Sequence, residues 1–317
     1  MTVDLPAAWG ALEIDPALVV GSFLVAVVVG LTGMGGGALM TPMMLLFFDV
    51  PPLAAVSSDL VASAVMKPVG GLVHLRRGTV NLRLVGWLCA GSVPAAFCGV
   101  LLARLLGEGE DVQQVVKYAL GVALLLAVAG LVGKAWLGAR RDARADAAAG
   151  DGTAGADIAP EVDVRPIPTV LVGTLGGLVV GVSSVGSGSL IIVALLLLYP
   201  TLRANGLVGT DLVQAVPLVL SAALGHLLFG DFRLDLTTSL LLGSLPGVYL
   251  GARVSARAPG GVIRALLVVV LLASSLKLLG VGTAATAWIL LGAIAVAACS
   301  WWVTRTRAAR VRQPQSL

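Results

Sequence analysis

Long apolar segments separated by short polar ones make up most of the chain. Most of them contain close to the roughly 20 apolar residues that a helix needs to cross a bilayer. The apolar segments are residues 17–48, 59–75, 84–106, 113–137, 167–199, 211–229, 236–256, 262–281 and 284–303. This pattern predicts an all-α, polytopic integral membrane protein.

Two of these segments are about 32 residues long, and glycine and serine interrupt both of them near the middle. The two interruptions read Gly33-Met34-Gly35-Gly36-Gly37 and Ser184-Val185-Gly186-Ser187-Gly188. Glycine exposes the backbone and costs conformational entropy inside a helix. We therefore expect residues 17–48 and 167–199 to be broken, re-entrant hairpins, each with two short arms.

The basic residues favour the same topology. If both long segments return to the side from which they started, nearly every Lys and Arg cluster falls on one side, which the positive-inside rule assigns to the cytoplasm. Straight crossings would instead place Arg76, Arg77 and Arg83 opposite the later basic loops. We expect a multi-pass protein of the cytoplasmic membrane, with the N-terminus outside and the C-terminus in the cytoplasm.

The composition strengthens the membrane assignment and adds little chemistry. Of the 317 residues, 58% are apolar and only 12% are charged, whereas soluble domains carry about 25% charged residues. The mean hydropathy is +0.99. The net charge is only +4, and the basic residues are dispersed in short clusters, which argues against nucleic acid as a partner. We predict no metal ion, cofactor or catalytic set.

The chain also contains an internal duplication. A shift of about 151 residues superimposes the two glycine-serine breaks, and after a one-residue insertion the match continues at a shift of 152. In that register Asp59 matches Asp211, and His74 matches His226. These are the only two histidines of the chain, so their alignment is hard to ascribe to chance.

Each half then contains one hairpin and three crossings, so the second half begins on the opposite side of the membrane. Inverted repeats with broken helices are typical of secondary transporters. Residues 138–166 are rich in Ala, Asp, Gly and Arg, which predicts a flexible linker. The predicted divisions are a first repeat over 17–137, a flexible cytoplasmic linker over 138–166, a second, inverted repeat over 167–281, an extra transmembrane helix over 282–304 and a basic cytoplasmic tail over 305–317.

The two breaks are the candidate binding site. The first amides of the helix that follows a break point at the gap, and together with the helix dipole they favour an anion. Packing of two helices through small residues is the alternative explanation. The candidate substrate-binding residues are Gly33, Gly35, Gly36, Gly37, Thr41, Ser58, Ser184, Gly186, Ser187, Gly188, Ser189 and Thr210.

Five ionisable residues within or at the ends of the spans are candidates for coupling or gating: Asp59, Asp211, His74, His226 and Lys67. A carboxylate facing the cavity could take up a proton or a cation, but capping of a helix explains the aspartates equally well. Anchoring at the membrane interface is the alternative to proton coupling for His74. Lys67 could complement an anion or pair with Asp59, and Val219 takes its place in the other half.

Several of these motifs resemble the sulfite exporter TauE/SafE family. The likeness lies in the first glycine break followed by Pro42, in His74-Leu75-Arg76-Arg77-Gly78, and in the second-half sequences 225–230 and 243–247, and it extends over residues 20–303. The resemblance implies movement of a small sulfur-containing anion, such as sulfite, thiosulfate or an organosulfonate, driven by an ion gradient. It implies the lipid bilayer and that anion as partners, and it leaves a homo-oligomer open.

This chain departs from the family pattern at three positions. The family usually has a hydroxyl residue where Asp59 and Asp211 stand, and Val193 takes the place equivalent to Pro42. A carboxylate beside the cavity would repel an anion unless a proton or a cation neutralised it.

We predict a permease that works by alternating access, and no enzyme activity. A passive anion channel would use the same residues. An intramembrane serine hydrolase, with Ser187 as nucleophile and His226 as base, has the minimum of the required groups. The duplication argues against the hydrolase, because Gly36 stands in the first half where Ser187 stands in the second, so that one break would have no role.

Overall fold

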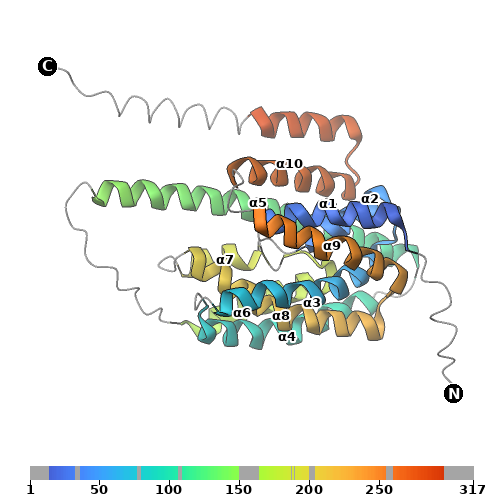
Figure 1. Ribbon diagram of the computed structural model, residues 1–317, viewed down its shortest axis with the longest axis horizontal. Helices are drawn as coiled ribbons and strands as arrows, with labels where there is room; N and C mark the ends of the chain where they lie inside the picture. The colour runs from blue at the N-terminus through green and yellow to red at the C-terminus, as the bar shows by residue number, and fades with distance from the viewer. Residues whose placement is uncertain are drawn as a thin grey trace.

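The computed structural model describes residues 14–32, 36–76, 80–105, 109–149, 164–186, 188, 190–199, 204–254 and 260–295. Within these ranges every regular element is a helix (Figure 1). The helices are α1 (Pro16–Thr32), α2 (Gly37–Phe47), α3 (Pro52–Arg76), α4 (Leu82–Leu105), α5 (Glu110–Ala149), α6 (Pro166–Ser183), α7 (Leu190–Leu198), α8 (Ala204–Phe229), α9 (Leu234–Val254) and α10 (Gly260–Leu278), followed by a helix over Thr283–Ala295. The prediction of an all-α fold is confirmed.

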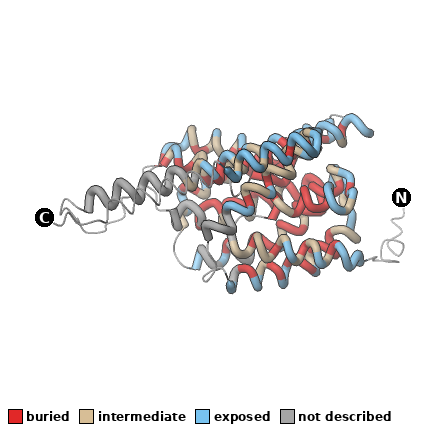
Figure 2. Tube along the Cα trace, turned by 90° about the horizontal axis from the view of Figure 1, so that it is seen from above, coloured by how far each residue is buried: buried red, intermediate tan, exposed pale blue. Residues whose placement is uncertain are grey.

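Helix length and surface chemistry agree with a membrane protein. Among the described residues, four stretches of helix are long and apolar enough to span a bilayer: Leu82–Leu105, Glu110–Gly133, Pro166–Ser183 and Gly209–Phe229. Four shorter apolar helices accompany them. Large apolar side chains also face outward, as at Leu175 (70% exposed) and Trp288 (74%), and the buried residues lie towards the interior of the bundle (Figure 2). Such a surface suits lipid better than water.

Both long apolar segments are interrupted where the sequence predicts. The first divides into α1 and α2, and the second into α6 and α7. The prediction of two short arms is wrong for α1 and α6, which have 17 and 18 residues and are therefore about 26 Å long. Only α2 and α7, with 11 and 9 residues, are short, at about 15 Å. Each broken segment thus has one long arm and one short arm.

The long arms pack most extensively on helices of the other half. α1 lies along α9, and α6 lies along α4. Glycine allows this approach: a Cβ atom at Gly251 of α9 would collide with the Val27 carbonyl oxygen of α1, and one at Gly181 of α6 with the Ala96 carbonyl oxygen of α4. Equivalent helices of the two predicted repeats therefore make equivalent contacts, as expected for interlocked repeats.

The region after the fourth predicted span differs from expectation. α5 has 40 residues and continues to Ala149, so the first part of the predicted flexible linker 138–166 is helical. Alanine and arginine dominate this extension, and both have high helix propensity. The end of α5 extends beyond the neighbouring helices (Figure 1). Residues 150–163 lie outside the described residues.

α3 and α8 pack against each other at the centre of the bundle. Buried apolar side chains from both helices, including Val56, Leu60 and Leu218, belong to the main hydrophobic core. The same two helices carry Asp59, Lys67 and Asp211, all of which are buried. The central pair therefore places the charged groups beside the two breaks.

Candidate substrate site at the two helix breaks

One carboxylate joins the two breaks. Thr41 on α2 donates a hydrogen bond from Oγ1 to Asp59 Oδ2 at 3.0 Å, and Ser184 at the end of α6 donates from Oγ to the same oxygen at 2.6 Å. Asp59 is 0% exposed. The first break, the second break and α3 thus meet at a single buried oxygen atom.

The backbones of the two breaks also touch. A Cβ atom at Gly37, the first residue of α2, would collide with the carbonyl oxygen of Ser184. Ser184 has φ 57°, a left-handed conformation that non-glycine residues rarely adopt and that is frequent at binding sites. This conformation ends α6 and accompanies the hydrogen bond of its hydroxyl to Asp59. Gly37 is therefore needed for the close approach.

Gly36 has more room than Gly37. The atoms nearest to a Cβ at Gly36 would be Met66 Cε at 3.6 Å, Met40 Cγ at 3.7 Å and Ser63 Oγ at 3.9 Å, all ordinary contact distances. Gly36 is also the N-cap residue of α2, so no side chain caps the first amides of this helix. Uncapped amides at a helix N-terminus favour an anionic oxygen.

Charged side chains surround this point. Lys67 is buried and interacts electrostatically with Asp211, and more weakly with Asp59. Lys67 and Asp59 belong to α3, whereas Asp211 belongs to α8. The pairing of Lys67 with Asp59 that the sequence suggested is thus shared with the aspartate of the other half.

Two buried polar residues on the helices that carry the aspartates were not among the sequence candidates. Ser63 is buried one turn after Asp59 on α3, near Gly36. Gln214 on α8 is also buried, and its Nε2 donates to Ser92 Oγ of α4 at 2.6 Å. The spacing of four residues from Asp59 would have identified Ser63, because residues i and i+4 share a helix face. The repeat does not identify Gln214, because Ala62 stands at the equivalent position of the first half.

His226 connects three helices beside the breaks. Its Nε2 lies 2.9 Å from the Gly181 carbonyl oxygen of α6, and its Nδ1 lies 2.8 Å from Ser57 Oγ of α3. Because a carbonyl oxygen can only accept, Nε2 carries a proton and donates it. His226 is fully buried within the protein. His74 belongs to α3, but its side chain lies outside the described residues.

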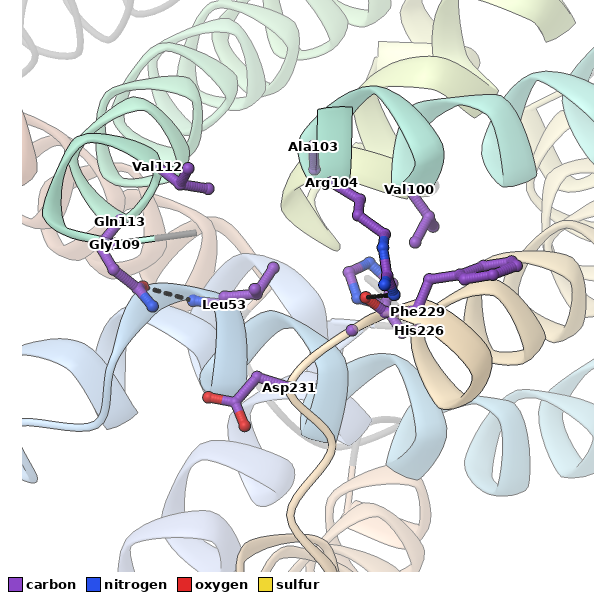
Figure 3. Close-up of a pocket in the computed structure, with 11 residues that line it drawn as sticks. Leu53, Val100, Ala103, Arg104, Gly109, Val112, Gln113, His226, Phe229 and Asp231 are labelled. Carbon is purple, nitrogen blue, oxygen red and sulfur yellow. Dashed lines mark hydrogen bonds between the residues drawn. The ribbon is translucent and has the colours of Figure 1, made fainter. Parts of the chain in front are cut away.

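A cavity of about 290 Å³ opens next to His226 (Figure 3). Arg104 on its wall donates from Nη1 to the Phe229 carbonyl oxygen at 3.3 Å, and its guanidinium lies 5.4 Å from the Phe229 ring centre. The lining consists of Leu53, Val100, Ala103, Arg104, Gly109, Val112, Gln113, His226, Phe229, Gly230 and Asp231. His226 therefore stands between this cavity and Gly181, three residues before Ser184 at the second break.

The other candidates divide into three groups. Gly36, Gly37, Thr41 and Ser184 meet around Asp59, and Gly186 (φ 126°) and Gly188 belong to the second break. Ser58 Oγ instead lies 3.5 Å from the Arg233 carbonyl oxygen, and Thr210 Oγ1 accepts from the Asn81 backbone N–H at 3.1 Å, so these two side chains bond elsewhere. Gly33, Gly35, Ser187 and Ser189 lie outside the described residues. Among the described residues, no group of three or more His, Cys, Asp or Glu side chains could hold a metal ion.

Comparison with known proteins assigns the chain to a family. The family described as "Sulfite exporter TauE/SafE" matches residues 18–278. This chain belongs to the TauE/SafE family. The resemblance noted in the sequence is thereby confirmed, and the chain is a membrane transporter of this family and not an enzyme.

Three relatives from Bacillus subtilis (strain 168) are named as probable membrane transporters. "Probable membrane transporter protein YjnA" is 33% identical over 265 residues, which cover 83% of this chain and 99% of the relative. "Probable membrane transporter protein YdhB" is 21% identical over 247 residues, or 76% and 91% of the two chains. "Probable membrane transporter protein YunE" is 33% identical over 96 residues, or 30% and 33%. No solved structure matches the chain.

Membership of a transporter family sets aside the serine hydrolase. The hydrolase would need His226 as its base. In the structure the Nδ1 atom of His226 is within hydrogen-bond distance of Ser57 Oγ, and its Nε2 atom is within hydrogen-bond distance of the Gly181 carbonyl oxygen. The nucleophile it requires, Ser187, lies outside the described residues.

Proposed function

We propose that this protein is a secondary transporter that moves a small sulfur-containing anion, such as sulfite, thiosulfate or an organosulfonate, across the cytoplasmic membrane. The observation that carries this proposal is the shared hydrogen bonding of Thr41 and Ser184 to one oxygen of Asp59. Two hydroxyls from two different breaks already hold an anionic oxygen. Sulfite and sulfonate groups present oxygens of the same kind, and hydrogen bonds to charged oxygens are the strong ones.

The packing supports alternating access as the mechanism. α1 with α9, and α6 with α4, approach so closely through glycine that each pair is expected to move as a unit. At Asp59 the two breaks are joined by side-chain hydrogen bonds, which are more easily exchanged than packed backbones. Rocking of one unit against the other would then open the site to one side of the membrane at a time.

The family name suggests the class of substrate, and the positive-inside pattern suggests the orientation. In the proposed orientation the N-terminus is outside, and the cavity beside His226 faces outward. An ion gradient would drive the anion, because a buried carboxylate next to the site otherwise opposes its entry.

The experiment is an uptake screen in liposomes that contain the purified protein, with sulfite, thiosulfate, sulfoacetate and small carboxylates, each with and without a pH gradient. We expect a sulfur-containing anion to accumulate above its external concentration, which distinguishes a coupled carrier from a passive channel. Gly36→Leu and Gly188→Leu should abolish this uptake while the protein remains in the membrane.

Gly86→Leu is the matched control, because no atom lies within 4 Å of the position that a Cβ at Gly86 would occupy. This variant should transport like the parent protein. Unchanged uptake by both break variants would contradict the proposal.

A further inference from the structure

Asp59 uses its two carboxylate oxygens unequally. Oδ2 accepts from both Thr41 and Ser184, whereas Oδ1 is buried and has no hydrogen-bond partner among the described residues. A buried carboxylate oxygen without a partner has lost its hydrogen bonds to water and has formed none with the protein, which costs free energy. Such an atom in a native protein points to a missing ligand.

A second unpartnered oxygen lies one turn away on the same helix face. Ser63 Oγ is buried and also has no hydrogen-bond partner in the described part of the chain. It lies 3.9 Å from the position of a Cβ at Gly36, so it faces the first break and not the lipid. Asp59 Oδ1 and Ser63 Oγ therefore form a pair of hard oxygen donors beside an uncapped helix end.

The charges near this pair do not balance. α2 and α6, which supply the two breaks, contain no ionisable residue. The charged neighbours of Asp59 are Lys67 on its own helix and, through Lys67, Asp211 on α8. Two carboxylates and one ammonium have a formal charge of −1, and a bound anion would raise the negative charge further in a low-dielectric interior.

We propose that Asp59 Oδ1 and Ser63 Oγ bind one monovalent cation, a sodium ion or a proton, and that this cation must be present for the substrate anion to bind. A sodium ion would be held by the carboxylate and hydroxyl oxygens, which are the donors that hard cations prefer. A proton would instead sit on Oδ1, with the Ser63 hydroxyl as a polar neighbour one turn away. Sodium would satisfy both oxygens, and either cation would neutralise the excess charge.

The site exists in one half only. Ala215 stands where Ser63 stands in the other repeat, so Asp211 has no equivalent hydroxyl one turn away. We therefore expect one coupling cation of this kind per chain. The inference rests on the proposed function for its role in transport, but the cation site itself can be tested without any anion.

The test uses the purified full-length protein in detergent, with ²²Na⁺ as the probe and infrared spectroscopy as the second readout. If sodium is the cation, the parent protein binds about one ²²Na⁺ per chain, Asp59→Asn abolishes binding and Ser63→Ala weakens it at least fivefold. If the cation is a proton, the parent protein shows the C=O stretch of a buried protonated carboxyl group. That band disappears in Asp59→Asn and shifts in Ser63→Ala, which removes a polar group beside the carboxyl.

Ser275→Ala is the matched control, because Ser275 is another buried serine with an unpartnered hydroxyl among the described residues, on α10. It should change neither readout. If Asp59→Asn fails to fold, as judged by the loss of its helical circular dichroism signal, the result for Ser63→Ala decides the test. The proposal is overturned if no ²²Na⁺ binds and no carboxyl band responds to both substitutions. Cation binding without anion uptake in liposomes would instead contradict the proposed function alone.

Discussion

Asp59 and Asp211 occupy matching positions in the two halves, but their surroundings differ. Asp59 accepts hydrogen bonds from Thr41 and Ser184 and has Ser63 one turn away. The matching residues around Asp211 lack these groups: Ile192 replaces Thr41, Gly33 replaces Ser184, Ala215 replaces Ser63 and Val219 replaces Lys67. The duplication thus provides two helix breaks, and in the described part of the chain the hydroxyl groups seen to bond to an aspartate gather at Asp59.

The histidines repeat this difference. His226 is held by Ser57, whereas the position that matches Ser57 in the second half is Gly209. Both sets include a contact between the halves: the Ser57 hydroxyl of the first half bonds to His226, and the Ser184 hydroxyl of the second half bonds to Asp59. The asymmetry therefore lies in side chains, while the packing of α1 on α9 and of α6 on α4 stays equivalent.

The largest effect on anion uptake is expected at the contact between the two breaks. Gly37→Ala places a Cβ against the Ser184 carbonyl oxygen, and overpacking of this kind costs about 1–3 kcal/mol or more. We expect anion uptake in liposomes to fall about 100-fold, because the breaks must separate to make room. Gly36→Ala, which has ordinary contact distances, should retain most of the uptake. Equal uptake by the two variants would refute the close contact.

Substitution of the two aspartates should have different effects: Asp211→Asn should mainly lower stability, and Asp59→Asn should mainly change transport. Asp211→Asn leaves Lys67 with a weaker counter-charge, and removing one partner of a buried ion pair costs about 3–5 kcal/mol. We expect a clear drop in thermal unfolding temperature that Asp211→Asn with Lys67→Met partly reverses. Asp59→Asn should unfold at a temperature closer to that of the parent protein but lose the dependence of uptake on the ion gradient. The reverse assignment of the two effects would break the comparison of the halves.

Giving the first half the residue of the second should weaken the site. Thr41→Ile removes one of the two hydroxyl donors to Asp59 Oδ2; a hydrogen bond to a charged group contributes about 1.5–3 kcal/mol. We expect roughly tenfold weaker anion binding, measured as a higher KM for uptake. Thr41→Ser retains the hydroxyl and serves as the control. A KM that is unchanged in Thr41→Ile would remove Thr41 from the site.

The smallest effect is expected at the histidine contact. Ser57→Ala removes the partner of His226 Nδ1, and a neutral hydrogen bond contributes about 1 kcal/mol to stability. We expect the thermal unfolding temperature to fall by a few degrees with little change in uptake. The unfolding temperature of His226→Gln should fall further, because this substitution also disturbs the hydrogen bond to the Gly181 carbonyl oxygen. A variant of His226 as stable as the parent would show that this buried contact does not hold the three helices together.

Sequence reasoning located the breaks because glycine acts locally on the helix in which it stands. It could not find the hydrogen bonds of Asp59, since Thr41 and Ser184 lie 18 and 125 positions away along the chain and meet it only in the folded structure. Ser58 and Thr210 directly precede the two aspartates in the sequence. Successive residues on a helix point in different directions, so these two side chains bond to other partners.

Two predictions about the fold were wrong: the length of the hairpin arms, and the flexible linker at the start of residues 138–166. The glycines mark where a helix stops but say nothing of the length of the arms, which is set by the helices packed beside them. The composition of residues 138–166 predicts a flexible linker, although alanine and arginine can prolong a helix without a buried face.

The exchange of long arms between the halves has a consequence for biosynthesis. Ser22 on α1 and Ser239 on α9 lie in contact, 217 positions apart, so a nascent chain inserts α1 long before the ribosome has made its partner. Until then the face of α1 that packs on α9 has only lipid and the early helices as neighbours. Separately expressed halves would each lack the surface on which their first helix rests, and co-expression should rescue both from degradation.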